Sequence, residues 1–181
     1  GYLKPFAAVR HVHFGAEAAI KWRLEYGDET KNIETIRLEI YPEAITYCGI
    51  RAPEKPLQAQ FSASYGLAHA LVTGGLGPEA YQTGALTDPE IMRLEALVKL
   101  VPDESLGDGG ARRARLLVGT GGDAIEVEGA RGDPENPLSE AEVREKFIQY
   151  AGPTLGPAAN KMAADILHGD LDRNLTGILN T

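Results

Sequence analysis

The sequence predicts an α+β fold in which helices form one layer on an antiparallel or mixed sheet. Helix and strand patterns follow one another without the regular alternation that builds a parallel sheet. Residues 33–41 alternate apolar and polar side chains, as a strand with one buried face does, and 97–101 is predicted as another strand. Residues 115–118 and 124–128 flank Gly121-Gly122, whose tolerance of positive φ favours a hairpin turn. A hairpin makes its two strands antiparallel.

Periodicity predicts helices in three regions. The first runs from about His13 to Tyr26, where apolar residues recur at helical spacing. These residues are Ala16, Ala19, Ile20 and Leu24. The second spans about 57–72, and its central Gly66 costs about 1 kcal/mol relative to alanine, so we expect close packing or a functional approach there. The tail over 158–179 is expected to be helical, with a break near Gly169.

Two further helices have recognisable start signals. Thr87 and Glu90, and again Ser139 and Glu142, have the spacing of a capping box, in which each side chain bonds the other residue's backbone N–H. Gly74 follows the second helix and is expected to cap its end. We therefore expect one helix to begin after Thr87 and another after Ser139.

Composition limits the class of protein. The 181 residues are 43% hydrophobic with a net charge of −8, so we predict a single globular domain over residues 1–181. Such an acidic chain offers no basic surface for nucleic acid or for an anionic membrane, and the short run 112–115 does not provide one. No apolar stretch reaches the roughly 18 residues that cross a bilayer. Cys48, the single cysteine, cannot form an internal disulfide, so we expect a reducing compartment, the cytoplasm.

The sequence shows no cofactor or metal motif. Residues 119–122 are glycine-rich, but they lack the lysine and hydroxyl of a phosphate loop and precede a strand. No pair of histidines has the helical spacing of a zinc protease site. The four histidines are His11, His13, His69 and His168. We therefore expect neither a metal nor an organic cofactor.

A group of residues that are or can be cationic lies just before the first predicted helix. If the chain loops here, Lys4, Arg10 and His13 converge beside the amino end of that helix, where free N–H groups favour anions. Arginine binds a carboxylate through two bonds and lysine supplies a point charge, so the group suits a substrate with several carboxylates. The alternative is ordinary surface charge with His13 capping the helix, and spacing alone favours that alternative.

Tyr65 is the second candidate. A phenol on a helix of small residues can point its hydroxyl into a cleft as a hydrogen-bond donor or general acid. A core tyrosine with a satisfied hydroxyl is the commoner situation.

Several motifs occur together and in order from about residue 2 to about residue 150. The chain opens with Lys4-Pro5-Phe6 and continues through Arg10 and His13 into a helix, and residues 59–71 fit the pattern A-x-F-S-x-x-Y-x-x-A-x-A-L. In this combination the chain resembles the second domain of the MmgE/PrpD family. Further matching segments are Leu86-Thr87-Asp88-Pro89, the stretch 132–139 and Lys146-Phe147.

The resemblance implies a longer, two-domain enzyme in which a helical amino-terminal domain precedes this chain and carries much of the active site. This chain would be the carboxy-terminal α+β lid of the substrate cleft, inactive alone. The family includes 2-methylcitrate dehydratase, cis-aconitate decarboxylase and iminodisuccinate epimerase. The implied activity is thus a cofactor-independent lyase of propionate metabolism acting on small polycarboxylates, and a homodimer is also implied. Lys4 and Arg10 match substrate-binding positions, while His13 and Tyr65 match catalytic ones.

Departures from the family pattern leave the substrate open. Phe6-Ala7 stands where the family often has Tyr-Pro, His69 replaces a small residue and Gly66 a bulkier one. Dehydration, decarboxylation and epimerisation remain alternatives, and a stand-alone module for oligomerisation or protein binding is a non-enzymatic hypothesis. The chain begins at Gly1 inside a motif, without an initiator methionine, so we expect it to be part of a longer protein.

Overall fold

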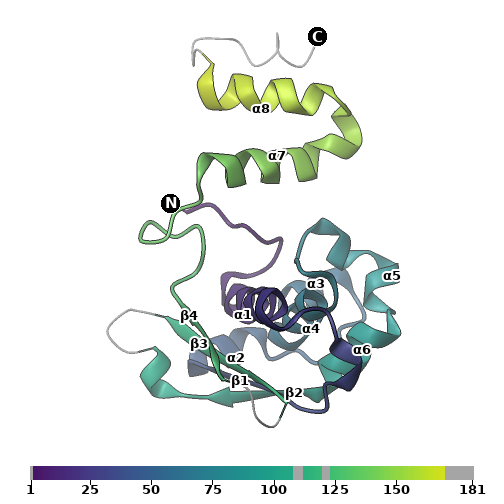
Figure 1. Ribbon diagram of the computed structural model, residues 1–181, viewed down its shortest axis with the longest axis vertical. Helices are drawn as coiled ribbons and strands as arrows, with labels where there is room; N and C mark the ends of the chain where they lie inside the picture. The colour runs from purple at the N-terminus through teal and green to yellow at the C-terminus, as the bar shows by residue number, and fades with distance from the viewer. Residues whose placement is uncertain (1, 108–111, 120–122, 170–181) are drawn as a thin grey trace.

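The computed structural model describes residues 2–107, 112–119 and 123–169 (Figure 1). It contains a four-stranded sheet in the order β2-β1-β3-β4, built from β1 (Ile36–Ile40), β2 (Val98–Pro102), β3 (Arg113–Val118) and β4 (Ile125–Glu128). β1 is parallel to β2, while β1 with β3 and β3 with β4 are antiparallel. The prediction of an α+β fold with a mixed sheet is confirmed. The predicted turn glycines at 121–122 and the tail beyond 169 lie outside the described residues.

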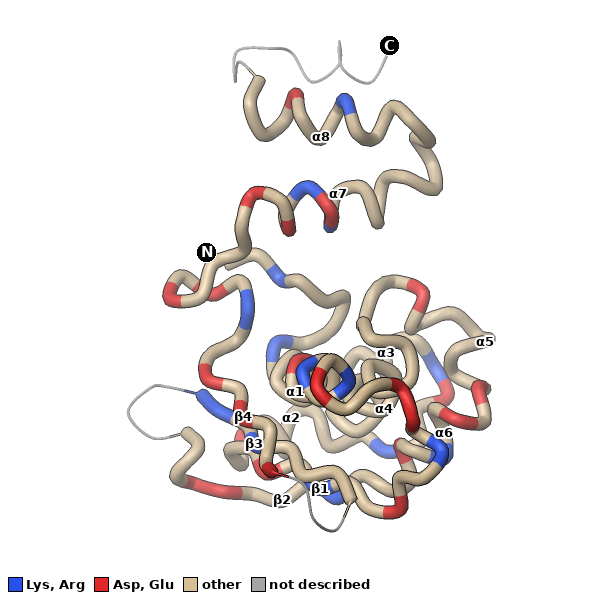
Figure 2. Tube along the Cα trace, viewed as in Figure 1, with Lys and Arg blue, Asp and Glu red and all other residues tan. Residues whose placement is uncertain are grey.

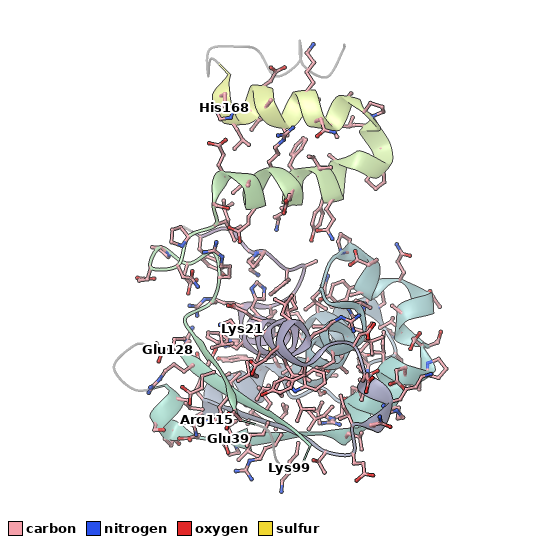
Figure 3. The ribbon with its side chains drawn as sticks, in the orientation of Figure 1. Lys21, Glu39, Lys99, Arg115, Glu128 and His168 are labelled. Carbon is pink, nitrogen blue, oxygen red and sulfur yellow. The ribbon has the colours of Figure 1, made fainter. Side chains whose placement is uncertain are left out.

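The two faces of the sheet differ as the alternating pattern predicted. Ile36, Leu38 and Ile40 are buried beneath the helices. The opposite face carries a row of ion pairs, in which Glu39 contacts Arg37 at 2.8 Å and Arg115 at 3.0 Å. Figure 3 shows Glu39, Arg115 and Lys99 along this charged side of the sheet. One face therefore meets the helical layer and the other carries charge.

Helices α1 (Arg10–Tyr26) and α4 (Ala63–Thr73) pack against each other and together cover the inner face of the sheet, α1 over β3 and β4 and α4 beside β2 (Figure 1). Gly66 lies where α4 meets α1, and a Cβ there would stand 2.4 Å from Cγ1 of Val12. The close packing expected at Gly66 is thus present.

The first helix begins three residues earlier than predicted, and one member of its expected apolar face is exposed. Ala16 and Ala19 are fully buried, but Leu24 is 83% exposed. Leu24 lies beside Gly74, where α4 has already ended, so no neighbouring helix covers it. The apolar face predicted for this helix is therefore buried at Ala16 and Ala19 but not at Leu24.

The predicted helix over 57–72 is two helices, α3 (Pro56–Gln60) and α4, separated at Phe61-Ser62. The Ser62 side chain accepts a hydrogen bond from the backbone N–H of Tyr65 at 3.1 Å, so it caps α4 and ends the continuity. Gly74 caps the other end in the left-handed conformation, with φ of 79°, as predicted.

The two predicted capping boxes had different outcomes. Helix α6 (Pro89–Leu97) is capped by Asp88, not by Thr87, because Asp88 accepts from the backbone N–H groups of residues 90 and 91 and Pro89 occupies the first helical position. The Ser139–Glu142 box is confirmed at the start of α7 (Glu140–Leu155).

Helices α7 and α8 (Ala158–His168) form a hairpin that stands apart from the sheet and its helices (Figure 1). They pack on each other through Ala159 and Ala163. Among the described residues, α7 has no fully buried side chain. The remaining short elements are η1 (Thr30–Asn32), α2 (Pro42–Cys48), η2 (Pro78–Tyr81), α5 (Thr83–Leu86) and η3 (Glu104–Leu106).

Candidate functional site

The segment before α1 folds back on the first turn of that helix and brings Lys4 and His13 to one backbone oxygen. Nζ of Lys4 donates to the carbonyl of Ala8 at 3.3 Å, and Nε2 of His13 donates to the same carbonyl at 3.2 Å. Arg10 and His13 are three residues apart in α1, so they lie on neighbouring parts of its surface. The structure therefore groups Lys4, Arg10 and His13 at the start of α1.

His13 is buried, with 1% of its surface exposed. Its pKa is lowered to about 4, mainly by burial and in addition by the nearby charges of Lys4, Lys146 and Arg10, while the bond to Ala8 opposes the shift. His13 is therefore neutral at neutral pH. Beside Lys4 and Arg10, His13 therefore contributes a hydrogen-bond donor and no third positive charge.

Arg10 is bound by a carboxylate of the protein itself. Nε of Arg10 donates to Oδ1 of Asp133 at 3.0 Å, and Nη2 contacts Oδ2, a paired geometry that also raises the pKa of Arg10. Asp133 is 6% exposed. Together they line an open polar cavity of about 790 Å³, which Tyr41 and Arg112 also border. Arg10 thus presents to a ligand only the part of its guanidinium that Asp133 leaves free.

Tyr65 has a different environment. Its hydroxyl donates to the backbone oxygen of Ala80, the side chain is 2% exposed, and burial raises its pKa to about 12. The ring borders an apolar cavity of about 480 Å³ that Pro53 and Met92 also line. That cavity is not lined by Lys4, Arg10 or His13. The structure thus groups the three basic residues with one another but does not place Tyr65 in a cavity with them.

Two residues of this region were not identified as site candidates from the sequence. Asp133 binds Arg10, and Lys146 of α7 donates from Nζ to the backbone oxygen of Lys4. Both lie in segments that match the family pattern, which was the only sequence signal for them. Their nearness to the amino-terminal segment depends on long-range packing, which spacing along the chain does not reveal.

Charge is spread over the molecule, with acidic and basic residues interspersed along the trace (Figure 2). Within the described ranges, no three histidine, cysteine or carboxylate residues gather as metal ligands would. No helix among the described residues is long and apolar enough to cross a bilayer.

The fold and the site define an α+β domain with a mixed sheet, a tightly packed pair of helices and a basic group at the start of the first of them. Residues 6–169 match the family model of the MmgE/PrpD C-terminal domain. The chain belongs to this family. No curated protein gives a significant match to the chain.

Proposed function

We propose that this chain is the lid domain of a lyase similar to 2-methylcitrate dehydratase and that it forms one wall of a cleft for small polycarboxylates. The proposal treats residues 1–181 as one domain, and a helical domain that precedes it supplies the opposite wall. The chain alone then binds part of the substrate and does not turn it over. Its compartment in this proposal is the cytoplasm, where the buried free thiol of Cys48 stays reduced.

One observation carries the proposal. Lys4 makes no ion pair with any carboxylate that the structure describes, although the protein has a net charge of −8 and acidic residues are plentiful. A half-buried ammonium without a counter-ion attracts an anionic ligand, and a carboxylate is such a ligand.

The dehydration assigned to this cleft needs a base that removes a proton α to a carboxylate and an acid that assists the loss of hydroxide. In the proposal Lys4 and Arg10 bind substrate carboxylates and stabilise charge that develops on an enolate-like intermediate. His13 is the proposed proton-transfer residue of the basic group, whereas Tyr65 borders a separate cavity and is assigned no proton transfer beside these residues. Neutral His13 donates from Nε2, which leaves the Nδ1 lone pair that a base requires. Tyr65, with a pKa of about 12, keeps its proton at neutral pH and donates it in a hydrogen bond to the backbone oxygen of Ala80.

The test uses the enzyme completed by its helical domain and a panel of di- and tricarboxylates. Lys4→Ala is expected to lower kcat/KM at least tenfold, which corresponds to about 1.4 kcal/mol of barrier. Lys99→Ala is the matched control, because Lys99 is exposed on the charged side of the sheet (Figure 3). Unchanged kinetics in Lys4→Ala would contradict the proposal. So would turnover by the 181-residue chain alone.

Decarboxylation and epimerisation are alternatives that use the same carboxylate contacts and break a different bond, and the product formed from each panel member distinguishes them. A non-enzymatic module is favoured by one observation. The α7–α8 hairpin stands apart and exposes Tyr150 and Ile166, 42% and 46% of whose surfaces are accessible. For that function we expect a homodimer by light scattering, together with no activity in the completed protein.

A further inference from the structure

We propose that Lys146 of α7 and Lys4 together form a binding site for one carboxylate group. The proposal rests on the proposed function for the class of ligand, a small di- or tricarboxylate. It adds to that function a lysine from the helical hairpin, which the sequence did not identify as a binding residue.

The first argument is the position of the Lys146 ammonium. Nζ of Lys146 donates to the backbone oxygen of Lys4 and lies 5.2 Å from the centroid of the Tyr150 ring. An ammonium has three N–H donors, and the bond to Lys4 uses one of them. Lys146 is half-buried. It therefore has donors left for a ligand, in a setting partly shielded from water.

The second argument is the lack of a counter-ion. On a helix the natural partner of Lys146 is the residue one turn earlier, Glu142. That carboxylate is already bound, because Glu142 accepts from Nε of Arg131 at 3.0 Å and from the backbone N–H of Ser139 at 2.7 Å. Within the described residues, neither Lys146 nor Lys4 contacts any carboxylate. Two lysines near each other are thus left without a carboxylate in direct contact, although Glu142 and Glu145 line the same pocket as Lys146.

The third argument is electrostatic. Burial lowers the pKa of Lys146, and the charge of Lys4 lowers it further. The charges of both lysines also contribute to the lowered pKa of His13, so the two ammonium groups act on the same small region. A carboxylate bound there would relieve the repulsion between them, and its two oxygens can each accept from one lysine. Arg10 is less suited to this task because Asp133 already occupies its paired donors.

The competing explanation gives Lys146 a purely structural role. Its bond to the Lys4 carbonyl would then only fasten α7 to the amino-terminal segment. The two explanations differ in one measurable respect. A fastening bond does not change when an anion is added, whereas a ligand held by the ammonium raises its pKa.

The experiment follows the lysine side chains of the 181-residue chain by NMR while tricarballylate is added. Tricarballylate is a tricarboxylate without a hydroxyl group to lose, so no dehydration interferes. We expect the pKa of Lys146 to rise on binding and Lys146→Met to weaken binding at least tenfold. Lys146→Arg, which keeps the charge and the donors, is expected to retain most of it. Lys99→Met is the matched control and should bind as the parent does.

The proposal is overturned if the Lys146 pKa does not move, if Lys146→Met binds as tightly as the parent, or if no binding occurs up to about 10 mM tricarballylate, a range that detects millimolar affinity. Binding that depends on Lys4 but not on Lys146 would overturn this site and leave the proposed function standing. Binding through both lysines, with no turnover of any polycarboxylate by the completed enzyme, would support this site and contradict the proposed function.

Discussion

Arg10 and Asp133, which are 123 positions apart, join the first turn of α1 to the loop between β4 and α7 through a hydrogen bond of 3.0 Å and a second contact beside it. In the same loop Gly132 accepts at its backbone oxygen from the N–H of Leu3 at 3.2 Å. The segment that carries Lys4 is therefore held between the helix and the loop. The ion pair maintains the geometry of the basic group even though it occupies Arg10.

Asp133→Asn is expected to lower the free energy of unfolding by about 1–3 kcal/mol. The substitution removes the charge that neutralises Arg10, and a part of the lost energy is recovered because Arg10 keeps some access to water. Urea denaturation measures the change. The control is Glu126→Gln, whose carboxylate pairs with Arg115 on the exposed side of the sheet and should contribute less than about 1 kcal/mol. Equal losses in the two variants would contradict the prediction.

Gly66→Ala is expected to destabilise the fold by about 1–3 kcal/mol, because the new methyl group would overlap Cγ1 of Val12 and press on Leu76, which stands 3.3 Å away. Adding Val12→Ala should restore part of the loss, since it removes the overlapping atom. In Gly84→Ala the new Cβ meets nothing within 4 Å, so that variant should be neutral or slightly stabilising. Additive effects of the Gly66 and Val12 substitutions would show that the two positions do not meet.

Local chemistry explains which features the sequence could predict. The alternation in β1, the Ser139 capping box and the Gly74 cap depend on residues within one turn or one strand, and all three are present. The cap of α6 was predicted at Thr87, but Pro89 occupies the first helical position, so the cap is Asp88.

The candidate site was less predictable for a physical reason. The chemistry of Arg10 depends on Asp133, and the backbone of Lys4 is contacted by Lys146, and both partners are more than a hundred residues away along the chain. The charge of His13 depends on its burial, which no local pattern records. The basic residues could thus be named from the sequence. Which of them pair with a carboxylate of the protein, or lose their charge on burial, could not.

The stability of the protein is expected to fall as the pH drops below the ordinary pKa of histidine. His13 has a pKa of about 4 in the folded protein, against the ordinary histidine pKa of 6.5 in the unfolded chain. Between these values the unfolded state binds more protons, so the free energy of unfolding decreases as pH falls, by up to about 3 kcal/mol from this residue. His11 and His69, whose pKa values burial also lowers, add to the trend.

The measurement is the free energy of unfolding at several pH values across this window. His13→Gln removes the titrating group and should flatten the dependence. His168→Gln is the matched control, because it replaces a histidine that is exposed on α8 and not buried (Figure 3). A slope that His13→Gln does not reduce would show that His13 is readily protonated in the folded protein.

Tyr65 and Tyr81 provide a comparison in which each variant loses a single oxygen. The Tyr65 hydroxyl donates to the buried carbonyl of Ala80, so Tyr65→Phe leaves that acceptor unpaired and should cost about 1–2 kcal/mol. The Tyr81 hydroxyl is buried and has no hydrogen-bond partner in the part of the chain that the structure describes. Removing it discards a polar group that burial has desolvated, so Tyr81→Phe should be neutral or stabilising. Urea denaturation of the two variants distinguishes them, and a loss in Tyr81→Phe as large as in Tyr65→Phe would mean that the Tyr81 hydroxyl is paired after all.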